Sequence, residues 1–266
     1  ICHVIRAFED DAIYHVSGAV NALRDFEAVN AELLMHDQIF AEKRIQRLEE
    51  EVKKIKDEAR QKELALMFRI KDHLEQESPL RLMALTGDEE KMIRSYPFIT
   101  RKKMVIAVNV GEEDLDSPDL LAGFTDSCDS QGIAAMMVSA KVEAEIALLD
   151  TKEEKQAFLE DLGIAETALE KLTRLCLQSL NLISFFTVGK DEVRQWLVRQ
   201  GSTAPKAAGV IHSDLERGFI RAEVFSYEDL MAMGSEAALK KNGRLHVEGK
   251  DYIVTDGDIL NIRFSV

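Results

Sequence analysis

The first 180 residues alternate short apolar runs with longer segments in which apolar side chains recur every three or four positions. Short apolar runs bounded by polar turns are typical of buried strands, and the longer spacing is typical of amphipathic helices. Strands that alternate with helices favour an α/β fold built on a parallel sheet. The expected strands are residues 1–8, 104–108 and 133–138, and the expected helices are residues 88–95, 119–130, 151–162 and 166–180.

Residues 25–78 interrupt this alternation with a long helical pattern. Two apolar seams of different phase run through it. The first is at Ile45, Leu48, Val52, Ile55 and Ala59, and the second is at Leu64, Met67 and Leu74 with Ile70 or Lys71 between. The phase changes near residues 57–62 without a Gly or Pro, which fits a tight helical hairpin or a stutter in one long helix. We favour the antiparallel hairpin, because a lone long helix would leave its seam exposed. Its balanced charge is usually that of a solvated coiled-coil face, and it is also compatible with an arm that docks on a large partner.

After Leu180 the chain changes to short β-rich runs separated by Gly/Asp turns. The runs are residues 182–187, 218–224, 245–247, 252–254 and 260–264, with helical patterns at residues 191–199 and at 227–233, extended toward 241. A small mixed sheet crossed by one or two helices is the expected architecture. We therefore place a domain boundary near Leu180.

Two of the predicted strands end in polar residues that suit a nucleotide base. One leads into Asn109-Val-Gly-Glu112 and the other into Ser139-Ala-Lys141. P-loop nucleotide switches hold the base with two such turns. The phosphate-binding motif G-x-x-x-x-G-K-[ST] does not occur in the sequence. We therefore interpret the chain as the C-terminal portion of a larger nucleotide-binding protein.

Composition narrows the choice of partners. The net charge of −14 argues against general nucleic-acid binding, although a local basic patch could still contact RNA. Cys2, Cys128 and Cys176 form no C-x-x-C motif, which favours a reduced, cytoplasmic location over a disulfide scaffold or zinc site. No apolar run reaches the ~18 residues of a membrane-spanning helix, so no membrane partner is expected.

Several further segments resemble one known family. They are Arg6-Ala-Phe-Glu-Asp-Asp11, Phe185-Phe-Thr-Val-Gly189, Glu192-Val-Arg-Gln-Trp196, Ala204-Pro-Lys-Ala-Ala-Gly-Val-Ile-His-Ser-Asp214, Glu216-Arg-Gly-Phe-Ile-Arg-Ala-Glu-Val224 and Gly249-Lys-Asp-Tyr-Ile-Val-Thr-Asp-Gly-Asp258. Together with the hairpin inserted between two strands, they resemble the YchF/Obg-like ATPase family. The resemblance covers essentially the whole chain and is strongest after residue 181.

The resemblance implies an α/β fold class in three parts. These are a partial P-loop NTPase parallel sheet, an inserted antiparallel helical hairpin (a coiled coil), and a C-terminal β-grasp module known as the TGS domain. The corresponding boundaries are residues 1–24 and 100–180 for the nucleotide-binding (OBG-type G) domain without its P-loop, 25–99 for the hairpin and 181–266 for the TGS domain.

Base specificity follows from the family motif N-x-x-E, which replaces the N-K-x-D of GTPases. In N-K-x-D the Asp accepts from two N–H donors of guanine, a pair that adenine lacks, whereas Asn109 retains a contact with the adenine N6/N7 edge. The resemblance thus implies ATP as the preferred nucleotide, with GTP tolerated. The nucleotide-binding residues that we predict are Asn109, Val110, Glu112, Ser139, Ala140, Lys141 and Phe8.

Two of these assignments have simpler alternatives. Phe8 would stack on the base or serve as a core aromatic, and Lys141 would cover the base with its methylene stem or lie on the surface. No catalytic or metal-binding residue is predicted within the chain. Mg²⁺ is implied for the full-length protein, with its ligands outside this sequence.

The resemblance implies a protein that couples slow ATP hydrolysis to binding of ribosomes or ribosomal subunits, in translation and stress responses. Hydrolysis requires a P-loop Lys and Mg²⁺ around the phosphates, so the chain as given is expected to bind nucleotide weakly and not to hydrolyse it. The alternative is a non-enzymatic adaptor that contacts the ribosome or RNA through the hairpin and the TGS domain.

Three weaker patterns have bland explanations beside functional ones. The D-x-x-G letters at Asp129-Ser-Gln-Gly132 lie downstream of the base motif and are interpreted as coincidence. His212 has no nucleophile or metal partner at a suggestive spacing, so we interpret it as a turn or surface residue. The basic residues of the TGS block form a ligand- or RNA-facing patch or simply solvated surface charge; they are Arg194, Arg199, Lys206, Arg217 and Arg221.

Overall fold

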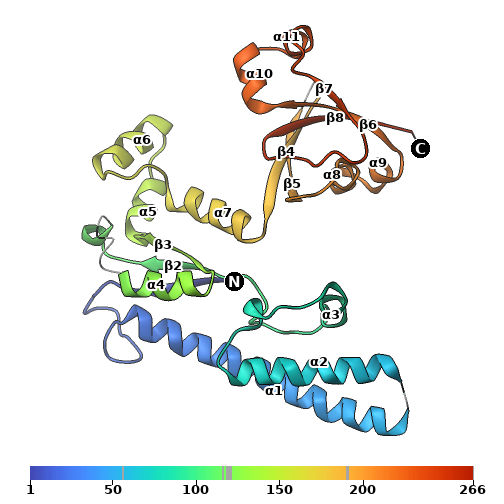
Figure 1. The fold of residues 1–266 in the computed structure, drawn as a ribbon. Helices are drawn as coiled ribbons and strands as arrows, with labels where there is room; N and C mark the ends of the chain where they lie inside the picture. The colour runs from blue at the N-terminus through green and yellow to red at the C-terminus, as the bar shows by residue number, and fades with distance from the viewer. Residues whose placement is uncertain (56, 116, 118–121, 190–191, 266) are drawn as a thin grey trace. The chain divides into compact units, whose positions relative to one another are not determined.

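The computed structural model describes residues 1–55, 57–115, 117, 122–189 and 192–265. The chain, drawn as a ribbon in Figure 1, divides into two compact units, Ile1–Leu172 and Thr173–Val266. Each unit has its own buried core. The division falls inside helix α7 (Ala168–Ser179), so this helix contributes residues to both units.

A three-stranded parallel sheet forms the centre of the first unit, as the alternating pattern predicted. Its strands are β1 (Cys2–Arg6), β2 (Val105–Asn109) and β3 (Ala134–Val138), in the order β1-β2-β3. The register pairs Asn109 with Arg6 on one side and with Val138 on the other. Within the described residues β1 pairs with β2 alone, and Val4 on this edge strand is 64% exposed. The carboxyl ends of all three strands therefore meet at one edge of the sheet.

Helices and short turns connect these strands. Before β2 come the 3₁₀ turn η1 (Leu80–Leu82) and α3 (Gly87–Met92), and the 3₁₀ turn η2 (Glu112–Asp114) and α4 (Ala122–Ser130) lie between β2 and β3. Helices α5 (Ala140–Ala147) and α6 (Lys152–Asp161) follow β3. The predicted helix at residues 119–130 is observed from Ala122, since residues 119–121 lie outside the described part. Capping boxes at Thr86–Glu89 and Thr151–Glu154 begin α3 and α6 by satisfying their free N–H groups.

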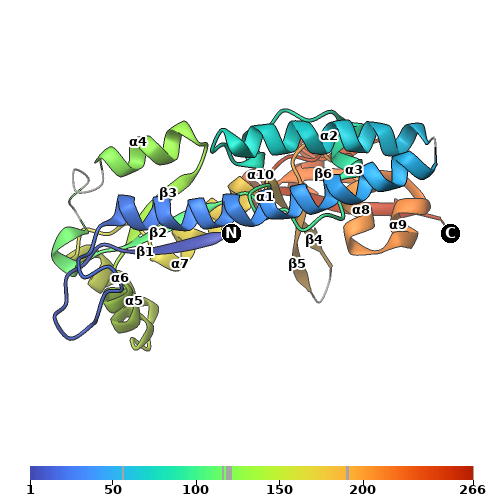
Figure 2. The same cartoon turned by 90° about the horizontal axis from the view of Figure 1, so that it is seen from below.

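The predicted helical hairpin is confirmed. Helices α1 (Ala22–Lys54) and α2 (Glu58–Glu75) lie side by side (Figure 2). The phase break needs no Gly or Pro because Asp57 starts α2 as its N-cap, accepting from Ala59 N at 3.0 Å. The buried seam runs through Ala41, Ile45 and Leu48 of α1 and Leu66, Met67, Ile70 and Leu74 of α2. The predicted first seam stops before Ile55, which is 56% exposed.

A buried carboxylate anchors the hairpin to the segment that enters β2. Asp37 of α1 is 0% exposed. It accepts from the backbone N–H groups of Ile99 (2.9 Å) and Thr100 (2.7 Å) and from Thr100 Oγ1 (2.7 Å). Leu80 N, just after α2, donates to the same Thr100 Oγ1 at 3.1 Å. One Asp and one Thr thus join both hairpin helices to the start of the central strand.

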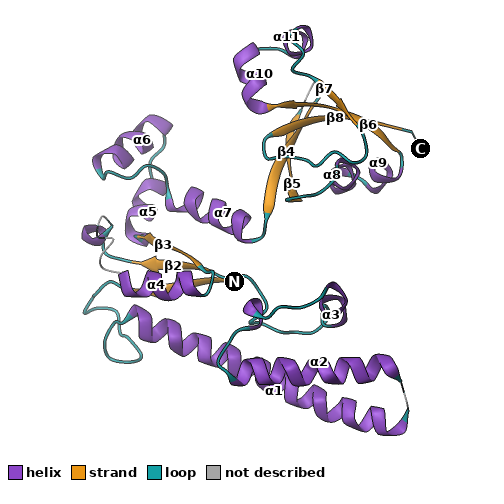
Figure 3. Cartoon of the chain, in the orientation of Figure 1, coloured by secondary structure: helices purple, strands orange, loops and turns teal. Residues whose placement is uncertain are grey.

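The second unit contains the predicted mixed sheet (Figure 3). Its strands are β4 (Leu182–Val188), β5 (Val193–Arg199), β6 (Phe219–Ser226), β7 (His246–Glu248) and β8 (Asp258–Phe264), in the order β5-β4-β8-β6-β7. Only β4 and β8 pair in parallel, and the other neighbours are antiparallel. Its helices are α8 (Ala204–Ile211), α9 (Ser213–Arg217), α10 (Tyr227–Met233) and α11 (Glu236–Lys241).

The helix predicted at residues 191–199 is wrong. Asp191 lies outside the described residues, and Val193–Arg199 forms β5, paired with β4 from Val188↔Val193 to Leu182↔Arg199. Trp196 and Val198 face the core on alternate positions, and Trp196 Nε1 donates to Thr187 Oγ1 at 2.9 Å. Pairing with β4 thus decides the conformation. The run at 252–254 contributes only an isolated bridge, Thr203↔Ile253, and Gly234, with φ +75°, separates α10 from α11.

Candidate nucleotide-base site

The turns that follow β1, β2 and β3 lie next to one another at the carboxyl edge of the sheet. Beyond the last ladder pairs, Ala7 N donates to Asn109 O at 2.7 Å and Val110 N donates to Val138 O at 2.9 Å. These bonds continue the sheet and fix the three turns relative to one another. In open α/β sheets this edge is where ligands bind.

Asn109 makes the contact that joins two of the turns. Its Oδ1 accepts from Ala140 N at 3.0 Å. Ala140 is the exposed first residue of α5, and Ser139 before it is the N-cap residue, 3% exposed. Since the carboxamide oxygen is held by Ala140, the Nδ2 group of Asn109 is oriented with its two donors away from that bond.

Glu112 and Lys141 meet across the same edge. Glu112 starts η2 and Lys141 lies in the first turn of α5. Lys141 Nζ lies 3.5 Å from Glu112 Oε2, and the two side chains are 73% and 44% exposed. An exposed pair of this kind is weak, on the order of 0–1 kcal/mol, so it can open at little cost.

Phe8 and Val110 differ in how much of each side chain is accessible at the carboxyl edge of the sheet. Phe8 is half-buried, and the Arg6 guanidinium lies over its ring, 4.7 Å from the centroid. Arg6 Nε also donates to Phe8 O at 3.0 Å. Val110 is 2% exposed and belongs to the core around Ile106 and Val108. Only its backbone is therefore available at the edge, while Arg6 is a neighbour that the sequence did not single out.

A cavity of about 250 Å³ lies beside the Ser139 turn. Val142 and Ile164 supply part of its apolar wall, and Glu143 lines it as well. Glu143 Oε1 accepts from Ala168 N at 2.7 Å, which joins α5 to the start of α7. No residue of this wall other than Ser139 was predicted from the sequence, because the wall is assembled from segments distant along the chain.

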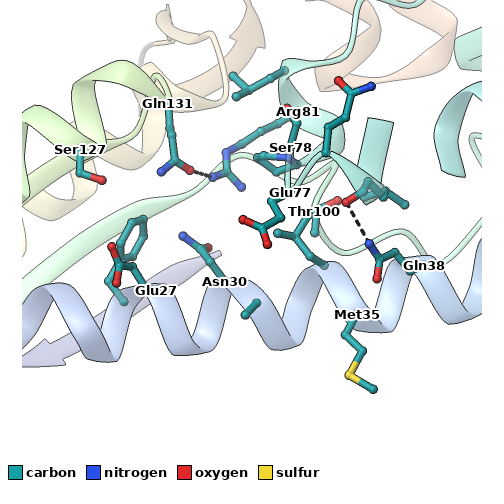
Figure 4. Close-up of a pocket in the computed structure, with 17 residues that line it drawn as sticks. Glu27, Asn30, Met35, Gln38, Glu77, Ser78, Arg81, Thr100, Ser127 and Gln131 are labelled. Carbon is teal, nitrogen blue, oxygen red and sulfur yellow. Dashed lines mark hydrogen bonds between the residues drawn. The ribbon is translucent and has the colours of Figure 1, made fainter. Parts of the chain in front are cut away.

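A larger cavity, of about 710 Å³, is formed by other residues of the first unit (Figure 4). Arg81 Nη2 donates to Gln131 Oε1 at 2.8 Å, whereas Arg81 Nε is buried without a partner. Burial lowers the pKa of Arg81. Two carboxylates, Glu27 and Glu77, also line this cavity. None of the predicted base-site residues belongs to it, so it is separate from the strand-end site.

The weaker sequence patterns have structural roles. Gly132 N donates to Asp129 O in the turn after α4. His212 is exposed, and its Nδ1 accepts from Asp214 N at 3.2 Å as the N-cap of α9. Three of the five basic residues have a partner within the second unit: Arg194 lies over the Trp196 ring, Lys206 pairs with Glu216 and Arg217 pairs with Asp214.

Other ligand chemistry is limited in the described part of the chain. There, no group of three or more His, Cys, Asp or Glu side chains is arranged to hold a metal ion. Cys128 is buried, and burial together with Asp129 raises its thiol pKa to about 11, which leaves little thiolate near neutral pH. No described helix is both long and apolar enough to cross a membrane.

Known proteins match both units. The family model YchF-GTPase_C, described as "Protein of unknown function (DUF933)", matches residues 182–265. The ribosome-binding ATPase YchF of Haemophilus influenzae is 43% identical over 266 residues, covering 100% of this chain and 73% of the relative. That of Bacillus subtilis is 41% identical over 269 residues with the same coverage. Obg-like ATPase 1 of Gallus gallus is 37% identical over 270 residues, covering 100% of this chain and 68% of the relative.

A solved structure shares the fold. The Schizosaccharomyces pombe YchF GTPase matches with a TM-score of 0.86 at 32% identity, covering 98% of this chain and 71% of that chain. The parallel sheet, the long helical hairpin and the C-terminal mixed sheet are thus common to both proteins.

Proposed function

Because the chain belongs to the YchF/Obg-like ATPase family, we propose that it recognises the base of an adenine nucleotide and associates with ribosomes in the cytoplasm. The base would lie against residues 109–112 and 139–141, with residues 1–24 and 100–180 as the nucleotide-binding part. Residues 25–99 would form the inserted arm and residues 181–266 the TGS domain. Relatives named ribosome-binding ATPases support this assignment.

The bond between Asn109 Oδ1 and Ala140 N carries the proposal. It leaves Asn109 Nδ2 free to donate to N7 of a purine. It also engages the Ala140 N–H, which is then not offered to the O6 keto oxygen of guanine. Adenine has an amino group at that position, which is a donor and needs no N–H from the protein. The geometry therefore supports adenine over guanine, with guanine tolerated through N7.

Glu112, Lys141 and Phe8 would complete the base site. Opening the exposed Lys141–Glu112 pair would let the Lys141 stem cover one face of the base. Phe8 would approach the base only if the Arg6 guanidinium left its ring or the base stacked on the other ring face. Both side chains would thus add contact area to a position set by Asn109.

The phosphates would have no partner within this sequence, because the G-x-x-x-x-G-K-[ST] motif is absent. When bound, Mg²⁺ and a P-loop Lys supply the charge that stabilises phosphoryl transfer. The residues of this chain would orient the base and exclude water from one of its faces. We therefore expect the chain to bind ATP weakly and to show no turnover.

Asn109→Ala tests the base site. The substitution removes the purine N7 donor and releases Ala140 N–H, so affinity for a fluorescent ATP analogue should fall about tenfold or more. Asn242→Ala is the matched control, since Asn242 is an exposed Asn at the end of α11 in the second unit. Equal affinity of wild type and Asn109→Ala would remove the assignment, and Mg²⁺-dependent ATP turnover would contradict the expected inactivity.

The adaptor alternative has its own outcome. If the wild-type chain binds no nucleotide while it still sediments with ribosomal subunits, the result favours a non-enzymatic ribosome-binding module. The balanced surface of the hairpin, with pairs such as Lys71–Glu42 and Arg60–Glu51, is compatible with either function.

A further inference from the structure

One stretch of this acidic chain contains no acidic residue. Residues 91–111 hold five Lys or Arg and no Asp or Glu, although the whole chain has 48 Asp and Glu in 266 residues. At that mean frequency, about four acidic residues would be expected in the stretch. The net charge of −14 therefore conceals a local excess of positive charge.

The fold gathers four of these cations around the entry to β2. Arg94 follows α3, and Arg101 Nη1 donates to Ile93 O at 3.4 Å, which holds Arg101 beside Arg94. Lys102 N donates to Ile99 O at 3.0 Å in a turn that leads through Lys103 to β2. We call Arg94, Arg101, Lys102 and Lys103 the basic turn.

The cations of the basic turn are available to a partner. Arg94, Lys102 and Lys103 are exposed, and Arg101 is half-buried. Within the described residues, none of the four forms an ion pair. By contrast, Lys91 just before them pairs with Asp88 at 3.0 Å, and the nearby Asp37 carboxylate is occupied by buried bonds to Ile99 and Thr100.

We propose that the basic turn binds the phosphate backbone of RNA. Unpaired Lys and Arg that neutralise phosphates release counterions, which provides affinity without base specificity. The aromatic neighbours Tyr96 and Phe98 pack against Phe40, with ring centroids 5.4 and 5.0 Å from it. They are therefore not presented beside the cations for insertion into a lipid surface, and the chemistry favours RNA over an anionic membrane.

The location separates RNA from nucleotide. The basic turn precedes Val105 at the amino end of β2, whereas Asn109 lies at the carboxyl end of the same strand. A strand rises ~3.3 Å per residue, so the two sites lie at opposite edges of the sheet. RNA and nucleotide can consequently bind together. That ribosomal RNA is the natural source rests on the proposed ribosome association.

Lys102→Ala/Lys103→Ala tests the basic turn in the full chain. The readout is fluorescence anisotropy of a labelled RNA hairpin titrated at several salt concentrations. Loss of two phosphate contacts should weaken binding about tenfold at low salt and make the slope of log K against log salt shallower by about 2. Lys240→Ala/Lys241→Ala, an adjacent exposed pair on α11, is the matched control and should leave both quantities unchanged.

A second variant and two further binding measurements distinguish the possible results. Arg94 follows α3 and does not belong to the segment directly before β2, so Arg94→Ala should weaken RNA binding in the same direction and serves if the double variant unfolds at a lower temperature. Unchanged RNA affinity in both variants, equal loss in the Lys240/Lys241 control, or wild-type binding to phosphatidylserine vesicles but not to RNA would overturn the inference. Sedimentation of wild type with ribosomal subunits tests the proposed function separately. Wild type that fails to sediment refutes that function while the RNA-hairpin result still decides the basic turn.

Discussion

At the scale of single residues, the base site shows what sequence position does and does not determine. Asn109, Glu112, Ser139 and Lys141 could be selected because they follow apolar strands. The bond between Asn109 Oδ1 and Ala140 N joins residues 31 positions apart, so no local pattern reveals it. Val110 follows the last strand residue and remains in the core at 2% exposure.

Glu112→Asp tests the reading of the specificity motif. The shorter carboxylate would stand where a GTPase accepts from the guanine N1–H and N2–H₂ donors, so the ratio of GTP to ATP affinity should rise about tenfold. Competition of the two nucleotides against a fluorescent analogue measures the ratio. Glu113→Asp, the same change at the next exposed carboxylate, should leave it unaltered, and an unaltered ratio in Glu112→Asp would refute the role of side-chain length.

At the scale of elements, the sequence predicts what local pattern controls. The phase break in the helical region indicated the α1–α2 hairpin correctly, because each seam must face a partner to be buried. The local pattern of residues 193–199 indicates a helix, whereas β5 owes its conformation to β4, with which it forms seven registered residue pairs. Tertiary pairing of this kind overrides local preference.

The hairpin seam predicts a contrast between two isoleucines. Ile70 of α2 is 0% exposed and Ile55 at the hairpin turn is 56% exposed. Ile70→Ala should lower the free energy of unfolding of the first unit by roughly 2–5 kcal/mol through loss of burial and a cavity. The same substitution at Ile55 should change it by less than about 0.5 kcal/mol. Urea unfolding followed by far-UV circular dichroism compares them, and equal effects would place the seam elsewhere.

At the scale of the whole molecule, two separate cores imply two unfolding events. The one Trp of the chain, Trp196, packs at the edge of the second core. Its fluorescence therefore reports on the second unit, whereas the helical signal is dominated by the long helices of the first. Substitutions in the hairpin seam and in the second core should thus be separable in one chain.

The second unit should also show a distinct alkaline response. Burial, with the hydrogen bond from Tyr252 Oη to Asp258 Oδ2 at 2.8 Å, raises the pKa of Tyr252 from its usual 10.0 to about 12. The folded state holds this proton more tightly than the unfolded state. Its stabilisation is therefore complete below pH 10 and is lost as the pH rises through about 12.

Urea midpoints from Trp196 fluorescence across this range measure the effect. Tyr252→Phe should flatten the decline that wild type shows between pH 10 and 12, because Phe has no proton to lose. Tyr227→Phe, at a 51% exposed tyrosine of the same unit, is the control and should keep the wild-type profile. An identical decline in wild type and Tyr252→Phe would show that other groups are responsible.

Because β1 pairs on one side only in the described residues, the outcome of refolding should depend on protein concentration. Within the described residues the outer edge of β1, where Val4 is exposed, pairs with no other strand, and such an edge can pair with a strand of another chain. Folding within one chain is first order, whereas such pairing between chains is second order. The rates of the two processes therefore depend differently on protein concentration. Refolding at low concentration should favour the monomer, and refolding at high concentration should favour chains paired through β1.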